Sequence, residues 1–344
     1  MSPPAAAILA VDGGNSKTDL ALIDRDGGVL ARLTGPTTSH QQVGRAAGID
    51  RLVGLVGDLY RVGGVAPAGA TPDVGVYGLA GADTPGDTRR LRTDIEARGL
   101  AGKAIVINDS FTPIRAGTDR AWGVSLICGS GVNAAGIAPD GRTARLAALG
   151  DISGDWGGGG DIGTAGLGAA VRARDGRGPA TVLATEVPAH FGLKRPIDVT
   201  RRVEAGAFGR DHLRSLSPVV FTAAARGDGV ARSIIDRQAD ELVAMAAAII
   251  RRLRMTRLAP DVVLAGGVFA ARDEPFEARI RAGIQAVARD ATIRRLDARP
   301  VLGVALLGLD EIHGSDPDRH AAAVRRLRSE LGSWAPGSDP VGRG

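Results

Sequence analysis

A carboxylate, two glycines and a run of polar residues follow an apolar segment near the start of the chain. The carboxylate, Asp12, could hold a hydrated Mg²⁺. The two glycines after it let the backbone bend tightly and approach a phosphate closely. Side-chain and backbone donors for phosphate oxygens come next. The whole segment is Ile8-Leu9-Ala10-Val11-Asp12-Gly13-Gly14-Asn15-Ser16-Lys17-Thr18.

These glycines lie between two strands, not before a helix. Residues 6–12 and 18–24 both have the apolar content of strands, and the glycines join them. A P-loop and a dinucleotide-binding turn both need a helix directly after their glycines. We therefore expect a phosphate to sit on a β-hairpin turn.

The same order of features appears a second time. Residues 122–128 and 133–138 are expected strands, and Gly129-Ser130-Gly131 joins them. An Asp-Gly turn and a third strand follow in both copies, which indicates an internal duplication of structure, not an array of short repeats. Either turn alone could be an ordinary glycine-rich hairpin. Together, the two turns predict a clamp that holds a β,γ-phosphate pair from both sides.

Asn108 and Asp109 lie where a strand is expected to end and a helix to begin. Both residue types suit the N-cap of a helix, which is one interpretation. Alongside two phosphate-binding turns, a carboxylate here could instead position an attacking alcohol and accept its proton. We expect Asp109 to be this general base.

Three further segments could contact a ligand. Ala265-Gly266-Gly267 could lie against an adenine ring, although a tight turn between strand and helix is the stronger interpretation of these residues alone. The glycine-dense segment 154–161 contains Trp156 and Asp161, which a flexible linker rarely does, so we expect it to close over a polar ligand. Asp161 could also cap the next helix. His40 lies in a polar loop, where it could contact sugar hydroxyls or simply be exposed.

Apolar periodicity predicts the elements that position these residues. Expected strands cover residues 6–12, 18–24, 29–33, 73–79, 104–108, 122–128, 133–138, 143–147, 261–264 and 292–296. Expected helices cover residues 43–60, 88–98, 110–117, 276–288 and 300–312, and the region 161–258 is expected to be mostly helical. Expected loops cover residues 36–42 and 150–160. Residues 319–331 could add a helix, and the last dozen residues are expected to be disordered.

Composition and charge narrow the class of protein. A chain of 344 residues is long enough for two cores, and an aromatic content of only 3% predicts that these cores are aliphatic. The formal net charge is +5, and the arginine clusters lie near acidic residues without interleaved aromatics. We therefore expect solvated faces, not a nucleic-acid-binding surface.

Cysteine usage and apolar segments limit the chain further. Cys128 is the only cysteine, so we expect neither an intrachain disulfide nor a cysteine-based metal site, and Cys128 itself should be a small buried residue. No basic region precedes the short apolar run at the start, and the apolar helical stretch at 242–250 is too short to span a bilayer. We expect a cytoplasmic protein without membrane contact.

The order of these motifs resembles the N-acetylglucosamine kinase family. That family belongs with the BadF/BadG/BcrA/BcrD-type ATPases, in the actin, hexokinase and Hsp70 superfamily. The resemblance covers roughly residues 5–312 and depends on the whole set in order, because no single motif is specific. The motifs are Val11-Asp12-Gly13-Gly14-x-Ser16-Lys17-Thr18, Asn108-Asp109, Gly129-Ser130-Gly131-x-Asn133, Gly160-Asp161-Ile162-Gly163-Thr164 and Ala265-Gly266-Gly267-Val268.

The resemblance implies an architecture. It implies an α/β protein with two ribonuclease-H-like (actin-like ATPase) domains and a nucleotide cleft between them. Residues 1–117 would form the N-terminal domain, completed by the helix at 300–312. Residues 118–299 would form the C-terminal domain with a helical insertion, and residues 313–344 a partly disordered tail. The expected assembly is a homodimer.

The resemblance also implies ATP and Mg²⁺ as cofactors and a sugar as the substrate. Asp12 would organise Mg²⁺, and Asp109 would be the base for the sugar 6-hydroxyl. The expected phosphate contacts are Gly13, Gly14, Asn15, Ser16, Lys17, Thr18, Gly129, Ser130 and Gly131. The expected adenosine contacts are Gly266 and Gly267. The expected sugar contacts are Ser39, His40, Asn108, Asp109, Asn133, Trp156 and Asp161.

Two segments near the expected sugar site depart from the family's pattern. Ser39-His40 stands where the family often has Asn-His, and Gly160-Asp161-Ile162-Gly163-Thr164 stands where it often has Gly-Asp-Glu-Gly-Ser. N-acetylglucosamine is the first expected substrate, with glucosamine and N-acetylmuramic acid as alternatives.

An ATPase that activates a partner dehydratase or reductase is an alternative of a different class. In the activators of this superfamily, two subunits hold an iron–sulfur cluster with two cysteines from each, whereas this chain has one cysteine. A sugar-sensing regulator that has lost catalysis is a third alternative. The presence of Asp12, Lys17 and Asp109 argues against that alternative.

Overall fold

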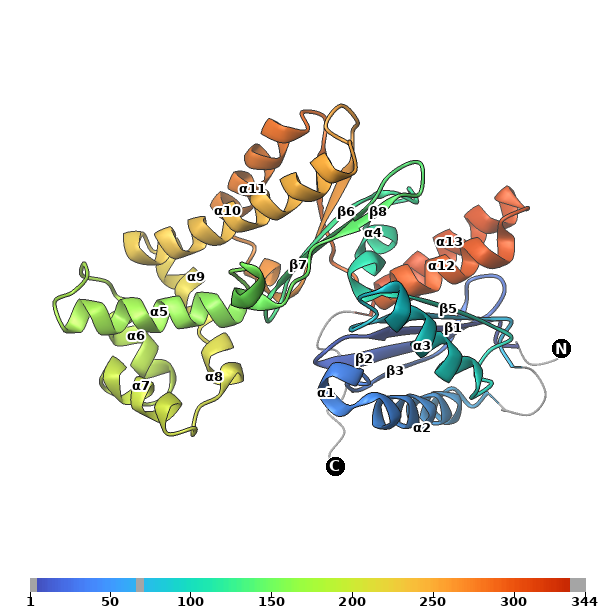
Figure 1. Ribbon diagram of the computed structural model, residues 1–344, viewed down its shortest axis with the longest axis horizontal. Helices are drawn as coiled ribbons and strands as arrows, with labels where there is room; N and C mark the ends of the chain where they lie inside the picture. The colour runs from blue at the N-terminus through green and yellow to red at the C-terminus, as the bar shows by residue number, and fades with distance from the viewer. Residues whose placement is uncertain (1–4, 66–70, 335–344) are drawn as a thin grey trace. The chain divides into compact units, whose positions relative to one another are not determined.

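The computed structural model describes residues 5–65 and 71–334, which form two compact units (Figure 1). Unit 1 contains the chain up to Ala121 together with the chain from Leu296 onward. Unit 2 contains the uninterrupted segment Trp122–Arg295. A five-stranded mixed sheet lies at the centre of each unit.

The sheet of unit 1 has the strand order β3-β2-β1-β4-β5. β1 pairs antiparallel with β2, which pairs antiparallel with β3. β1 also pairs parallel with β4, which pairs parallel with β5, so the carboxyl ends of these three strands meet at one edge. The strands are β1 (Ile8–Gly13), β2 (Lys17–Ile23), β3 (Val29–Pro36), β4 (Val74–Leu79) and β5 (Lys103–Asn108).

Both faces of this sheet are apolar, so helices cover both. Successive side chains of a strand point to opposite faces. Ile8 and Ala10 of β1 accordingly pack with α12 and α13, and Leu9 and Val11 pack with α2 and α3. Figure 1 shows α12 and α13 side by side and α2 on the other side of the sheet. The helices are α1 (His40–Val43), α2 (Arg45–Gly63), α3 (Pro85–Glu96), η1 (Asp109–Phe111), α4 (Thr112–Gly117), α12 (Val301–His313) and α13 (Pro317–Gly332).

The sheet of unit 2 repeats the topology of unit 1. Its strand order, β10-β9-β6-β7-β8, is that of unit 1 with β6 in the place of β1. β6 pairs antiparallel with β7 and parallel with β9, as β1 does with β2 and β4. This pairing confirms the predicted duplication. The strands are β6 (Gly123–Cys128), β7 (Val132–Ile137), β8 (Thr143–Arg145), β9 (Asp261–Ala265) and β10 (Thr292–Arg295).

One core cluster, rich in alanine, valine, leucine and isoleucine, joins the sheet of unit 2 to its helices. This composition confirms the aliphatic core expected from the low aromatic content. The helices are η2 (Gly150–Ser153), α5 (Gly159–Arg174), α6 (Leu183–His190), α7 (Pro196–Glu204), α8 (Arg210–Arg214), α9 (Ser217–Ala225), α10 (Gly229–Arg252), η3 (Gly267–Ala271) and α11 (Glu274–Val287).

Three local predictions need correction. The segment 36–42 is not entirely a loop, because β3 continues to Pro36 and α1 begins at His40. The helix expected at 88–98 begins earlier, at Pro85, because Thr84 and Asp87 form a capping box that satisfies the first free N–H groups. The segment 150–160 contains the short helix η2, and α5 already begins at Gly159.

The chain after α12 is built into unit 1. α13 extends the helix expected at 319–331, and its Leu327 and Leu331 are fully buried. Trp334 is also buried, with 1% of its surface exposed. The rest of the stretch expected to be disordered, residues 335–344, lies outside the described residues. Within residues 5–65 and 71–334, no helix is both long and apolar enough to cross a membrane.

Candidate functional site

The parallel strands of unit 1 bring the predicted acidic residues to one edge of its sheet. Asp12, near the end of β1, lies opposite Gly78 of β4 in the pairing register. Asn108 ends β5, and Asp109 follows directly as the first residue of η1. In open α/β sheets ligands bind outside the carboxyl ends of the strands, so this edge is the expected place for a site.

Asp12 lies in an electrostatic environment that disfavours its charge. Burial, and then the negative charges of Asp109 and Asp19, raise the pKa of Asp12 well above the ordinary carboxyl value. The hydroxyl of Thr112 lies 3.3 Å from Asp12 Oδ1 and 2.9 Å from the carbonyl oxygen of Asp109, so it connects the two acidic residues. Asp109 is only partly buried, as a general base requires.

The surroundings of Asp12 fit a divalent cation. Its interacting carboxylates concentrate negative charge that a cation would relieve. Within the described part of the chain, no group of three or more His, Cys, Asp or Glu side chains is arranged to hold a metal by itself. Mg²⁺ usually takes one or two carboxylates and completes its shell with water and substrate phosphates. Asp12 therefore fits Mg²⁺ better than a metal held entirely by protein.

Asn108 has a clear structural role. Its Oδ1 accepts a hydrogen bond from Ser110 N at 3.0 Å, so it caps η1 as the simpler interpretation predicted. Its Nδ2 donates to Asp83 Oδ1 at 2.9 Å, and Gln41 Nε2 donates to the other oxygen of Asp83 at 2.9 Å. Asp83 thus connects Asn108 to the start of α1. Asp83 was not among the predicted residues, and its only local signal is that it lies four residues after the end of the buried strand β4.

β1 and β2 form the hairpin that the first pair of glycines predicted. Gly14 N donates to Lys17 O at 3.0 Å and closes the turn. A Cβ on Gly13 would lie 2.8 Å from Leu79 Cδ2 and 3.0 Å from Thr38 Oγ1, so a side chain at this position would displace the side chains packed around it.

The polar residues of this turn divide into an exposed and a buried group. Asn15, Ser16 and Lys17 are exposed at the tip, where a phosphate could reach them. Thr18 is fully buried, and its hydroxyl lies 3.0 Å from the hydroxyl of Thr38. The Thr18 side chain therefore supports the turn from beneath, and phosphate contact by this residue stays a prediction.

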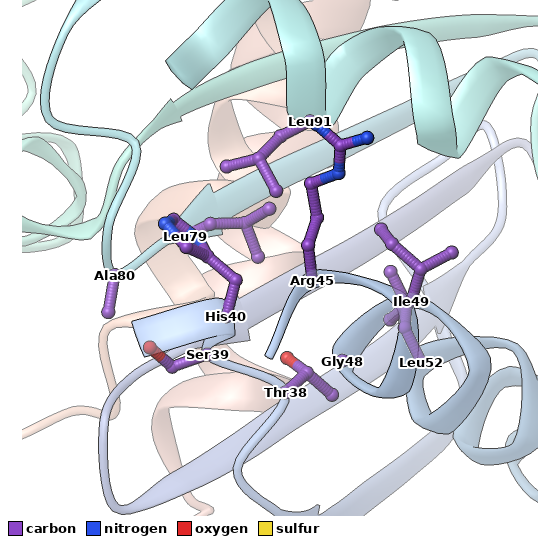
Figure 2. A pocket seen from close by; sticks show the side chains of 10 residues that line it. All are labelled: Thr38, Ser39, His40, Arg45, Gly48, Ile49, Leu52, Leu79, Ala80 and Leu91. Atoms are coloured by element: carbon purple, nitrogen blue, oxygen red, sulfur yellow. The ribbon is translucent and has the colours of Figure 1, made fainter. Parts of the chain in front are cut away.

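Ser39 and His40 lie where the chain after β3 meets the first turn. Ser39 Oγ donates to Asn15 Oδ1 at 2.7 Å. His40 is partly buried, not fully exposed, and Figure 2 shows it beside Leu79 and Ala80 in a pocket of about 10 Å³. Its Nδ1 is buried and has no hydrogen-bond partner among the described residues. A pocket of this size has room for about one water molecule or one ligand atom.

The second glycine turn joins β6 to β7, as predicted. Gly129 N donates to Gly131 O at 2.9 Å. A Cβ on either glycine would meet no described atom within 4 Å, and neither residue has a positive φ. Packing and backbone conformation therefore give no reason for glycine at these two positions. Close approach of a ligand to the bare backbone does give a reason.

The start of α5 holds this second turn. Gly159 N donates to Gly129 O at 2.8 Å, and Gly160 N donates to Ser130 O at 3.1 Å. Arg214 Nη1 donates to Ser130 Oγ at 2.7 Å. The positive end of a helix and a guanidinium group thus adjoin the turn, which suits an anionic ligand.

The glycine-dense segment before α5 packs tightly against the same turn. A Cβ on Gly158, whose φ is +84°, would lie 2.4 Å from Gly131 Cα. Gln238 of α10 is fully buried and accepts from Gly158 N at 2.7 Å. Asp161 is not the N-cap residue, because the helix begins after Gly158, and its carboxylate instead accepts from Gly157 N at 2.7 Å. The segment is therefore fixed by specific contacts.

The remaining predicted residues of unit 2 lie close to these elements. Asn133 and Trp156 are partly buried, and the Arg237 guanidinium lies 3.9 Å from the centroid of the Trp156 ring, a cation–π contact. Gly266 and Gly267 follow β9 and are exposed. Whether these four residues contact a ligand stays a prediction.

Gly266, after β9, packs closely against Cys128 at the end of β6. A Cβ on Gly266 would lie 2.4 Å from Cys128 O, so the two strand ends can lie this close only with glycine. Cys128 is fully buried, as expected, and burial raises the pKa of its thiol to about 12. By contrast, a Cβ on Gly267 would meet nothing within 4 Å among the described residues, which leaves its backbone accessible.

Some residues at the candidate site could not be found by local pattern. Arg214 lies 84 positions from Ser130, and Gln238 lies 80 positions from Gly158. Both belong to helices of unit 2 whose sequences carry no motif. Thr112 had a weak signal, since it follows Asp109 by three positions in the first turn of a helix.

The fold has two α/β units with one repeated strand order and a glycine turn after the first strand of each, and solved structures described as sugar kinases share it. A solved structure described as a proposed N-acetylglucosamine kinase from Chromobacterium violaceum is similar, with a TM-score of 0.68 and 22% identity over 89% of this chain and 100% of that chain. A glucokinase of the ROK family from Streptomyces griseus, solved with glucose and AMPPNP, has a TM-score of 0.52 and 16% identity over 87% of this chain and 97% of that chain.

The sequence model of the BadF/BadG/BcrA/BcrD ATPase family matches residues 9–308, and the chain belongs to this family. The N-acetylmuramic acid/N-acetylglucosamine kinase of Clostridium acetobutylicum is 29% identical over 76% of this chain and 85% of its own length. The N-acetyl-D-glucosamine kinase of Dictyostelium discoideum is 26% identical over 88% of this chain and 97% of its own length.

Proposed function

We propose that this protein is an ATP-dependent amino-sugar kinase that transfers the γ-phosphoryl group of ATP to the 6-hydroxyl of N-acetylglucosamine or a related hexosamine. The observation that carries the proposal is the strand edge of unit 1. There Asp12 and a partly exposed Asp109 interact electrostatically beside a glycine turn. Membership of an ATPase family and the names of the two relatives support ATP and an amino sugar as substrates.

In this proposal each group has one task. Asp109 positions the sugar hydroxyl and accepts its proton. The two glycine turns and Lys17 bind the phosphates through backbone and side-chain donors. Asp12 holds Mg²⁺, which neutralises phosphate charge when it is bound. Ser39, His40 and Asp161 are among the proposed sugar contacts.

N-acetylmuramic acid is the second candidate substrate. The Clostridium acetobutylicum relative is named for both N-acetylmuramic acid and N-acetylglucosamine, which favours this sugar as the alternative. Glucosamine is a third. The two departures from the family's sequence pattern, at Ser39 and at residues 160–164, lie among the proposed sugar contacts. They bear on which sugar is bound, and the assay below compares the candidate sugars directly.

A role as the activator of a partner dehydratase or reductase is disfavoured by Cys128. It is the only cysteine, it is fully buried, and burial raises the pKa of its thiol to about 12. An iron–sulfur cluster needs several accessible thiolates, so a cluster shared between two copies cannot form at this residue.

A coupled assay of ADP release tests the proposed function. The purified protein is given ATP and Mg²⁺ with N-acetylglucosamine, N-acetylmuramic acid, N-acetylmannosamine, glucosamine, glucose or no sugar. We expect ADP release only when an amino sugar is present, together with a product phosphorylated at the 6-hydroxyl. Release that is equal with and without every sugar would show an ATPase, not a kinase.

We further propose that the protein is a cytoplasmic homodimer. Light scattering coupled to gel filtration measures its mass directly. A mass near one chain of 35.2 kDa would contradict the dimer.

A further inference from the structure

Asp19 lies beneath the first glycine turn and has two different cationic partners. It faces Asp12 across the β1–β2 pair and has 1% of its surface exposed. Its Oδ2 accepts from Lys17 Nζ at 2.7 Å, and its Oδ1 accepts from Arg299 Nη1 at 2.9 Å. A buried carboxylate is therefore shared between an exposed lysine of the turn and an arginine from the far end of the chain.

Arg299 is itself enclosed. It has 2% of its surface exposed, although it lies just before α12 and 280 positions from Asp19. The same Nη1 also donates to Thr34 Oγ1 at 2.6 Å. The guanidinium lies 4.1 Å from the centroid of the Trp334 ring, which follows α13 and is 1% exposed. Trp334, from the chain after α13, thus contacts Arg299, and Arg299 contacts Asp19 beneath the turn.

We propose that Arg299 is a positioning residue for nucleotide binding, and that it acts through Asp19 on Lys17. Without a second cation, Lys17 alone would neutralise the buried carboxylate of Asp19. The ammonium group of Lys17 would then attract phosphate less strongly. Arg299 takes up one oxygen of Asp19. An ammonium group has three N–H donors, so Lys17 keeps two for phosphate oxygens while one bonds to Asp19. Trp334 stabilises Arg299 by a cation–π contact in a buried site. This inference rests on the proposed nucleotide site.

The cost of burying these charges supports a role beyond stability. A buried ion pair gains little net stability, because desolvation offsets the attraction, and apolar residues of similar volume often serve as well. The pair here lies directly below a lysine at the tip of the first turn. A charge balance at this place changes what the lysine can bind, which apolar residues could not do.

Calorimetric titration with ADP in the presence of Mg²⁺, and with adenosine, tests this inference without any sugar. Arg299→Gln should weaken ADP binding about tenfold or more, the effect of one charge-assisted contact, and leave adenosine binding unchanged because adenosine has no phosphate. Asp19→Asn combined with Arg299→Gln should return ADP binding to within about threefold of the wild type, because neither charge remains. A merely structural role of Arg299 predicts no such rescue.

Arg115→Gln is the matched control. Arg115 donates to both oxygens of Asp310, at 2.7 and 2.8 Å, in another ion pair of unit 1 that does not touch the turn. The Arg115 side chain is buried in this pair, whereas the Asp310 side chain is 33% exposed. This variant should lose stability and keep its ADP affinity. If Arg299→Gln does not fold, the single variant Asp19→Asn tests the inference. It removes the carboxylate that binds Lys17, so it should bind ADP at least as tightly as the wild type.

Three results would overturn the inference. They are unchanged ADP binding in Arg299→Gln, failure of the double variant to recover, and weaker ADP binding in Asp19→Asn. Absence of ADP binding by the wild-type protein would overturn the proposed function itself, together with this inference.

Discussion

The surroundings of Asp12 destabilise the charged form of its carboxyl group. Because its pKa in the folded protein is raised by burial, Asp109 and Asp19, the protonated form is the one that folding favours. The stability gained from this shift is fully present below the carboxyl pKa of the unfolded chain. It is lost as the pH rises through the higher pKa of the folded protein. At neutral pH, which lies above the carboxyl pKa of the unfolded chain, the raised pKa of Asp12 therefore costs stability.

Asp12→Asn should accordingly be more stable than the wild type at neutral pH when Mg²⁺ and nucleotide are absent. We expect a rise in Tm of a few degrees, which corresponds to about 1 kcal/mol, together with the loss of kinase activity. The advantage should shrink as the pH falls, because the wild-type Asp12 then becomes protonated. Thermal melts at several pH values measure both effects.

Asp140→Asn is the control for this prediction. Asp140 is exposed, and Arg142 lowers its pKa, so replacing it should change Tm little and should not raise it. A fall in Tm for Asp12→Asn at neutral pH would contradict the prediction.

Asp109→Asn should separate binding from chemistry. An amide keeps the shape of the carboxylate but cannot accept the sugar proton, so turnover should fall by about 10²- to 10⁴-fold. ADP affinity should stay close to that of the wild type, since the proposed phosphate contacts lie on the glycine turns. Steady-state kinetics and calorimetry measure the two quantities. Unchanged phosphorylation of the sugar by this variant would remove Asp109 from its assigned role.

The residues of the candidate site could be predicted where they follow a strand directly. Asp12 and Asp109 were found because each comes after an apolar run, and parallel pairing then brings such positions to one edge. Arg299 could not be found in this way. Its partner Asp19 is 280 positions away, and only the folded chain brings the two together.

At the scale of the elements, a glycine of the second turn and a glycine of the segment before α5 differ in what a side chain would meet. A Cβ on Gly131 would meet no described atom within 4 Å, whereas a Cβ on Gly158 would lie 2.4 Å from Gly131 Cα. Gly158 also has a φ of +84°, a conformation that other residues rarely adopt. One glycine thus leaves space for a ligand, and the other is needed by the fold.

This difference predicts opposite results for the same substitution. Gly131→Ala should keep the Tm of the wild type and raise the KM for ATP, because its methyl group enters the space proposed for phosphate. Gly158→Ala should lower the stability by more than about 1 kcal/mol, through backbone strain and the clash.

Gly168→Ala on α5 is the matched control. A Cβ there meets nothing within 4 Å among the described residues, and alanine is the better helix former, so stability should hold or rise. Thermal melts and ATP kinetics distinguish the three variants. Wild-type kinetics in Gly131→Ala would show that the second turn does not contact phosphate.

The elements were most predictable where burial on both faces makes a continuous apolar run, as in β1, β4 and β6. The prediction of element boundaries was weakest where contacts between residues distant in sequence determine where an element begins. α5 begins within a run of glycines, which have low helix propensity. The carbonyl groups of Gly129 and Ser130 accept the first N–H groups of that helix, a contact that no local pattern shows.

At the scale of the whole molecule, the last helix belongs to the core of unit 1. Leu327 of α13 is fully buried in the cluster that also contains Ile8 and Ala10 of β1. Leu327→Ala should therefore lower the free energy of unfolding by about 2–5 kcal/mol, the usual cost of a cavity left by leucine. Arg325→Ala, on the exposed side of the same helix, should change it by less than about 0.5 kcal/mol. Denaturant unfolding measures both, and equal effects would show that α13 is not part of this core.

The division of the chain also sets an order of events during translation. Unit 2 is one uninterrupted segment, so all of it emerges from the ribosome before α12 and α13 do. Domains generally fold as units during synthesis. Unit 2 would therefore fold on the nascent chain first. At that stage α12 and α13 would not yet cover Ile8 and Ala10 of β1. In that interval the half-built first unit exposes an apolar sheet face, which makes it the natural client of a chaperone and the part most prone to aggregate.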